Sequence, residues 1–143
     1  MTTPYWDEYF MAIAKLASTR SKDRSTKVGA VIVRDKTILS TGYNGFPRGV
    51  DDTVEARYER PLKYIWTVHA EENALLHAAR EGISINGSTM YATLHPCSAC
   101  AKSIVQCGIK EVIVEDDENP RFTEDFKIAK EIFAEAGVIV RHR

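Results

Sequence analysis

Apolar positions change their spacing along the chain, and each change marks a predicted element. Across Tyr5–Ser18 apolar residues recur every three or four positions, which predicts an amphipathic helix. Two runs rich in β-branched residues follow, at Val28–Val33 and Ile38–Tyr43, and both predict strands. The short segment Arg34–Thr37 separates these runs, so we expect an antiparallel hairpin.

The second half of the chain repeats a helix-then-strand pattern. Each predicted helix ends at a glycine, the residue that most readily forms a helix C-cap. These helices begin near His69, Cys97 and Thr123 and end at Gly82, Gly108 and Gly137. The strand-like runs after the glycines are Thr89–Leu94, Glu111–Val114 and Val138–Arg141. Right-handed crossovers make these last strands parallel, which predicts an α/β fold with a five-stranded mixed sheet and helices on both faces.

One long segment, Gly45–Thr67, shows little sustained periodicity and contains Pro47, Pro61 and charges of both signs. Connections of this length in small domains are usually functional or mobile. The rest of the sequence shows no internal repeat, low-complexity tract or linker. The pattern therefore predicts one domain over residues 1–143.

Composition narrows the classes of partner. The net charge is -1, and the 19 basic residues are dispersed, so no nucleic-acid footprint is expected. No apolar run is long enough to span a membrane, and Asp7 and Glu8 make the N-terminus unlike a basic export signal. Two of the three cysteines form a C-x-x-C, which suggests reduced thiols and a metal. We expect an intracellular, cytoplasmic protein.

Two short motifs carry the candidate chemistry, His69-Ala70-Glu71 and Pro96-Cys97-Ser98-Ala99-Cys100. Cys97 and Cys100 share one face of the predicted helix, and its N-terminal dipole favours thiolates. His69 opens the preceding helix, and in a parallel unit both helix starts lie at the same sheet edge. Three protein ligands would leave the fourth tetrahedral position of a zinc ion open to water, as in catalytic zinc sites.

Glu71 lies within one helical turn of His69 but not on the same face, so it can reach the water without binding the metal. A carboxylate placed there can take a proton from water and return it to a ring nitrogen and to leaving ammonia. The order H-x-E…P-C-x-x-C is typical of zinc-dependent nucleobase deaminases. We therefore predict zinc ligands at His69, Cys97 and Cys100 and a catalytic Glu71.

Other residues of these types favour structural roles. A C-x-x-C alone also occurs in structural zinc sites and redox pairs. Cys107 is about 10 Å further along the helix than Cys100, which predicts a core thiol. Glu72 is expected on a solvated helix face. His77 and His142 have no partner spacing, and His95 either lines the pocket or is structural.

Longer motifs give the chain a family resemblance. They are Ser21–Val33, Gly42-Tyr43-Asn44-Gly45-Phe46-Pro47-Arg48-Gly49-Val50-Asp51-Asp52, Val68–Glu71 and Pro96–Cys100. From about Trp6 to its C-terminus the chain resembles the cytidine deaminase superfamily, and most of all its deoxycytidylate (dCMP) deaminases. The resemblance implies a three-layer α/β/α cytidine deaminase-like fold. It also implies hydrolysis of dCMP to ammonia and dUMP, which would supply thymidylate synthesis.

The same resemblance implies further residues and partners. Asn44 would contact the sugar, the backbone at Val28 and Ala70 the pyrimidine, and Ser25 the neighbourhood of the 5′-phosphate. Such enzymes are commonly hexamers activated by dCTP and inhibited by dTTP with Mg²⁺. The effector site implied here comprises Gly42, Tyr43, Asn44, Gly45 and Arg48. Because the long loop lacks Cys and His, one zinc per chain is expected.

Alternatives remain open from the sequence. The chain could deaminate another nucleotide, a nucleoside, a base or adenosine in tRNA, or it could be a non-catalytic, zinc-stabilised binding module. The Asn44-Gly45 pair is also typical of a strand-ending turn with positive φ. Arg48 is either a phosphate ligand or one of several bases in a charged loop.

Overall fold

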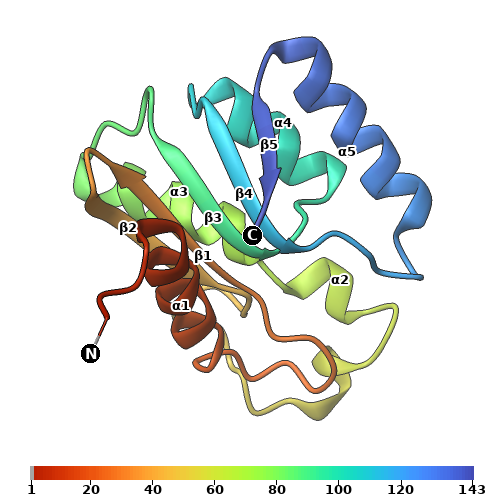
Figure 1. Ribbon diagram of the computed structural model, residues 1–143. Helices are drawn as coiled ribbons and strands as arrows, with labels where there is room; N and C mark the ends of the chain where they lie inside the picture. Colours follow the sequence, from red (N-terminus) through yellow and green to blue (C-terminus); the bar gives the residue numbers. More distant parts are fainter. Residues whose placement is uncertain (1) are drawn as a thin grey trace.

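A computed structural model describes residues 2–143 and shows an α/β fold built on a five-stranded sheet (Figure 1). The strand order is β2-β1-β3-β4-β5. The strands are β1 (Gly29–Arg34), β2 (Thr37–Tyr43), β3 (Thr89–Leu94), β4 (Glu111–Asp116) and β5 (Ile139–His142). The main helices are α1 (Trp6–Ser18), α3 (Ala70–Glu81), α4 (Ser98–Gln106) and α5 (Thr123–Ala136).

The predicted hairpin is confirmed, because β1 and β2 pair antiparallel. Asp35 and Lys36 form the tight turn with φ values of 52° and 58°, which suits the twist of a two-residue hairpin. β1 also pairs antiparallel with β3, while β3, β4 and β5 run parallel as predicted. Gly82 and Gly137 adopt the left-handed conformation that ends α3 and α5.

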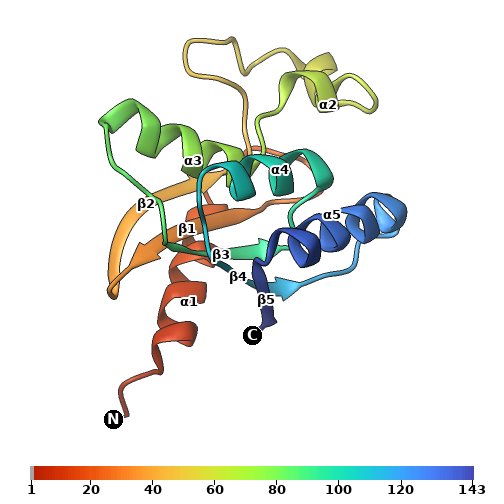
Figure 2. The same ribbon diagram turned by 90° about the horizontal axis from the view of Figure 1, so that it is seen from above.

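Helices cover both faces of the sheet, which confirms the predicted layers (Figure 2). On one face α1 packs Phe10, Met11 and Ala14 against a small cluster that includes Val31 and Tyr91. On the other face α3, α4 and α5 enclose the larger core. Because α3 and α4 share that face, their N-termini can approach each other at one edge of the sheet.

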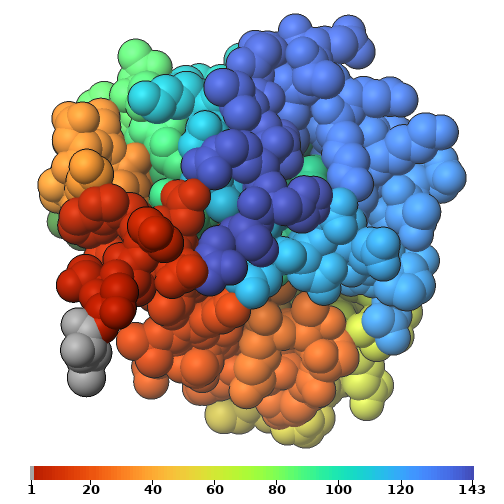
Figure 3. All heavy atoms as spheres, viewed as in Figure 1, coloured from red at the N-terminus to blue at the C-terminus, as the bar shows by residue number. Residues whose placement is uncertain are grey.

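The first helix and the last strand of the chain lie next to each other (Figure 1). In the space-filling view (Figure 3), red α1 residues and dark blue residues of the C-terminus lie side by side. Arg141 bridges Asp7 at 3.1 Å and Glu111 at 3.0 Å. These contacts tie α1 to the edge strand β5.

The segment predicted as an irregular loop contains two short helices, η1 (Glu55–Tyr58) and α2 (Lys63–Trp66). An isolated antiparallel bridge between Gly45 and Val68 closes its base. The hydrophobic spacing did not predict these turns because four-residue helices are too short to show a period. Within residues 2–143, no helix combines the length and the apolar character needed to cross a membrane.

Candidate active site

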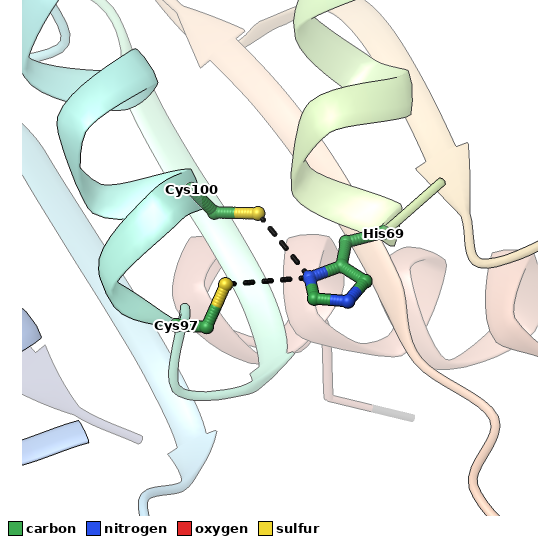
Figure 4. A group of neighbouring side chains, drawn as sticks. All are labelled: His69, Cys97 and Cys100. Carbon is green, nitrogen blue, oxygen red and sulfur yellow. Dashed lines mark hydrogen bonds between the residues drawn. The ribbon is translucent and has the colours of Figure 1, made fainter. Parts of the chain in front are cut away.

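Three side chains from two helix starts converge at one edge of the sheet (Figure 4). The Nδ1 atom of His69 lies 3.3 Å from the sulfur of Cys97 and 3.5 Å from the sulfur of Cys100. A tetrahedral zinc ion separates its nitrogen and sulfur ligands by about 3.5 Å. The three predicted ligands therefore fit a zinc ion that binds the imidazole through Nδ1.

Local structure explains this convergence. His69 is the N-cap of α3 and Cys97 is the N-cap of α4. The sequence predicted that each residue begins its helix, and each in fact stands one residue before it. Cys100 follows in the first turn of α4, so both thiols lie at the positive end of its dipole, as predicted. Asp125 of α5 accepts hydrogen bonds from the amide and the hydroxyl of Ser98 at 2.8 and 2.6 Å, which fixes this helix start.

Hydrogen bonds among His69, Cys97 and Cys100 shift the pKa values of all three side chains. The hydrogen bond from Cys100, followed by that from His69, lowers the pKa of the Cys97 thiol, while hydrogen bonding to Cys97 and burial raise the pKa of Cys100. The hydrogen bond to Cys97 raises the pKa of His69 to about 9. These shifts favour a thiolate at Cys97, which is the form in which a cysteine binds a metal ion.

Glu71 lies in the first turn of α3 with only 4% of its surface exposed. Burial raises the pKa of its carboxyl to about 7, although the positive charge of His69 opposes the shift. A carboxyl with a pKa close to neutrality can both accept and donate a proton at physiological pH. Its position beside the ligands fits the predicted proton carrier.

A cleft that we call the metal cleft opens beside these residues. His69, Glu71 and Cys97 line it, and it contains about 710 Å³ of open space including its solvent-exposed mouth. Further lining residues come from several elements and include Val28, Asn44, Ala70, Leu94, Phe122 and Phe126.

The predicted substrate residues lie at or beside the metal cleft. The backbone N–H of Val28 donates to Asn44 Oδ1 at 2.8 Å, and Asn44 Nδ2 donates to the carbonyl of Thr26 at 2.9 Å. Asn44 therefore ties the end of β2 to the cleft wall. Ser25 is exposed and lies outside the lining set, but its hydroxyl contacts Lys63 and Arg60, which do line the cleft.

A second cleft, the loop cleft, contains most of the predicted effector residues. Tyr43, Asn44, Gly45 and Arg48 line it together with Arg20, Lys22 and neighbouring residues. Neither Asn44 nor Gly45 has a positive φ, so the alternative of a strand-ending turn of that type is wrong. Gly45 instead pairs with Val68 in an extended bridge.

Gly42 lies apart from the loop cleft, buried beneath α3. A side-chain carbon there would stand 2.3 Å from the carbonyl oxygen of Ala70 and 2.5 Å from the amide of Ala74. The glycine thus permits close packing of β2 on the helix that carries Glu71. This close approach accounts for Gly42 without an effector.

The remaining histidines and acidic candidates lie outside the metal group. Cys107 packs against the larger core as predicted. Glu72 is half-buried and does not line the metal cleft. His77 bonds the carbonyl of Thr41, and His142 pairs with Asp117 at the surface.

His95 lines the metal cleft and is also buried against Phe126 and Phe133. Both roles left open by the sequence therefore apply to this residue. Its Nδ1 bonds the carbonyl of Pro96 at 2.8 Å, and burial lowers the pKa of the ring.

Sequence reasoning missed the cations at the mouth of the metal cleft. Arg60 and Lys63 come from the long segment, and Arg121 comes from the turn before α5. The segment's mixture of charges was the available signal. No spacing rule connects Arg60 and Lys63 with His69, because their place beside the metal cleft depends on how the long segment folds back.

Comparisons with known proteins agree with this site. The helix-start ligands, the buried glutamate and the fold together define a zinc-dependent deaminase. Residues 4–116 match the family described as "Cytidine and deoxycytidylate deaminase zinc-binding region", and the chain belongs to this family.

Individual relatives point to the dCMP deaminase type. The chain is 42% identical to the deoxycytidylate deaminase of Mus musculus over 142 residues, which cover 95% of this chain and 78% of that protein. It is 41% identical to an uncharacterized deaminase of Aliivibrio fischeri over 138 residues, covering 94% and 91% of the two chains. A crystal structure of cyanophage S-TIM5 dCMP deaminase with dCMP and dUMP is similar, with a TM-score of 0.81, 32% identity and full coverage of both chains.

Proposed function

We propose that this protein hydrolyses dCMP to dUMP and ammonia. The observation that carries the proposal is the meeting of His69, Cys97 and Cys100 beside the buried carboxyl of Glu71 in one cleft. A structural zinc site has no need of such a carboxyl, which disfavours the binding-module alternative.

The chain's own residues supply the remaining parts of the reaction. His69, Cys97 and Cys100 would hold a zinc ion, which when bound makes water acidic enough to serve as a nucleophile near neutral pH. Glu71 would carry one proton from water to the pyrimidine ring nitrogen, and then a second proton, from the hydroxyl added at C4, to the amine that leaves as ammonia. The apolar wall formed by Leu94, Phe122 and Phe126 would exclude bulk water from the base.

The charge of the cleft mouth favours a nucleoside monophosphate over a free base or nucleoside. Arg60, Lys63 and Arg121 line the same cleft as Glu71, and Arg and Lys are the usual partners of phosphate. The cyanophage relative was crystallised with dCMP and dUMP. A small cationic mouth in a chain of net charge -1 fits one phosphate better than a nucleic-acid backbone.

An ammonia-release assay tests the proposed substrate. Zinc-loaded protein is assayed with dCMP, CMP, deoxycytidine, cytosine and guanine under the same conditions. We expect dCMP to give the highest kcat/KM. Zinc-loaded protein that is inactive on dCMP but active on another member of the panel would overturn the assignment.

We further propose a homo-oligomer, a hexamer by family resemblance, whose activity responds to dCTP and dTTP at the loop cleft. Support comes from Arg20 and Arg48, which line this cleft, and from Asn44, which lines both clefts. The resemblance adds Mg²⁺ as a companion of the nucleotide. Light scattering measures the oligomeric state. In a separate assay, Arg48→Ala should weaken activation by dCTP and leave the activity without effector unchanged.

A further inference from the structure

A buried ion pair joins the α2 segment to the chain before β1. Lys63 Nζ lies 3.1 and 3.2 Å from the two carboxylate oxygens of Asp23. The two side chains are 9% and 8% exposed, and both line the metal cleft. Burying two charges carries a large desolvation cost, so a pair at this place suggests a functional role.

The hydroxyl of Ser25 links this pair to a second cation. It accepts hydrogen bonds from Lys63 Nζ at 3.0 Å and from Arg60 Nη2 at 2.8 Å. Its own hydrogen is directed to Asp23 Oδ1 at 3.3 Å. Two cationic groups are therefore held together by one serine oxygen at the rim of the metal cleft.

Backbone amides hold the carboxylate of Asp23 in place. The amides of Ser25 and Thr26 both donate to Asp23 Oδ1 at 2.9 Å. The carboxylate thus stands at a position set by backbone, and it orients the flexible Lys63 side chain.

The cluster carries an excess of positive charge. Asp23 balances Lys63, and within residues 2–143 no carboxylate lies within ion-pair distance of Arg60. An anion that entered the cleft would meet this uncompensated charge.

The other ion pairs that join the long segment 45–67 to the chain before β1 are exposed. Arg24 and Glu55 pair at 2.9 Å, but their side chains are 52% and 74% exposed. Exposed pairs of this kind contribute little to stability. The buried pair of Asp23 and Lys63 is the electrostatic contact that best determines where α2 stands relative to the cleft.

We propose that Asp23 is a positioning residue that holds Lys63, and through Ser25 also Arg60, ready for the 5′-phosphate of the nucleotide, an inference that rests on the proposed function. The ammonium can exchange the Ser25 oxygen for a phosphate oxygen while it keeps Asp23 as its partner. Asp23 itself does not contact the phosphate, because like charges repel. Its effect reaches the substrate only through Lys63 and Ser25.

Product inhibition gives a direct measure of this role. The inhibition constant of dUMP is compared with that of deoxyuridine, which lacks the phosphate, for wild type, Asp23→Asn, Lys63→Met and the double variant. Glu55→Gln breaks the exposed pair between the same segments and is the matched control. Zinc content and circular dichroism are recorded for every variant, and the wild type is assayed for ammonia release from dCMP.

We expect Asp23→Asn and Lys63→Met each to weaken dUMP inhibition about tenfold or more and to leave deoxyuridine inhibition within about twofold. The double variant should be inhibited by dUMP as strongly as Lys63→Met alone, because Asp23 acts through Lys63. Equal losses for dUMP and deoxyuridine, a fully additive double variant, or the same loss in Glu55→Gln would overturn the proposal.

A second variant keeps the test decisive if Asp23→Asn does not fold. Ser25→Ala removes the exposed hydroxyl that joins the two cations and should weaken dUMP inhibition selectively. Unchanged dUMP inhibition in both Ser25→Ala and Lys63→Met would contradict the inference. A wild type that does not release ammonia from dCMP refutes the proposed function instead, so the two failures are distinguishable.

Discussion

Nδ1 of His69 lies 3.3 Å from the sulfur of Cys97, although the two residues are 28 positions apart in the chain. The contact joins the N-caps of α3 and α4, and each of these helices follows a strand at the same edge of the sheet. The fold therefore brings the three ligand side chains together from two separate helix starts.

Glu71→Gln should abolish most turnover and leave the metal site intact. The amide cannot accept the proton from water, so we expect kcat for dCMP to fall by about a hundredfold or more. Glu72→Gln, one residue further along α3 and outside the metal cleft, is the control and should keep its activity. Zinc content is measured in both variants, and a Glu71→Gln enzyme with near-normal kcat would contradict the role of this carboxyl.

Cys100→Ala should lose zinc and stability together. Removing one of three protein ligands lowers zinc affinity, and the folded protein then loses the stabilisation that the ion provides. The measurements are zinc content after dialysis and the shift of Tm on adding zinc. Cys107→Ala removes a cysteine outside the ligand set and should retain one zinc per chain, so zinc loss in Cys107→Ala alone would reverse the assignment.

The free energy of unfolding should depend on pH through the carboxyl of Asp23. Burial by itself raises the pKa of this carboxyl, but hydrogen bonds from Thr26 and Ser25 and the charge of Lys63 outweigh it and lower the pKa below 3.8. A lowered pKa in the folded state stabilises the protein above the unfolded pKa, and this contribution is lost as the pH falls through the folded value.

Wild type should therefore exceed Asp23→Asn in free energy of unfolding by about 2 kcal/mol or more at pH 7. The difference should narrow below about pH 4. Urea unfolding at several pH values measures it. A difference that stays constant down to pH 3 would show that the charge of Asp23 does not stabilise the fold.

Gly42→Ala should destabilise the protein by displacing α3. The added carbon would meet backbone atoms of Ala70 and Ala74 at 2.3 and 2.5 Å, and backbone cannot move aside as a flexible side chain can. We expect a loss of about 2 kcal/mol or more and weaker zinc binding, since His69 caps the same helix. At Gly45 an added carbon meets only the Tyr43 ring at 3.8 Å, so Gly45→Ala is the stability control in the same unfolding experiment.

Sequence spacing was sufficient for the parts of the molecule governed by local rules. The alternation of helix and strand after His69, with a glycine at each helix end, predicted the parallel half of the sheet. The motifs at His69–Glu71 and Pro96–Cys100 predicted the metal ligands because their residues stand at helix starts, whose geometry is local.

Tertiary structure decided the contacts that have no local period. Lys63 reaches Asp23 across 40 positions because the segment between β2 and α3 folds back over the cleft. Gly42 is required by its close approach to α3, which no turn or cap rule reveals. The sequence by itself thus determined which residues could bind zinc and predicted the proton carrier. The tertiary structure decided which charges line the metal cleft, because ion pairs between distant segments depend on packing.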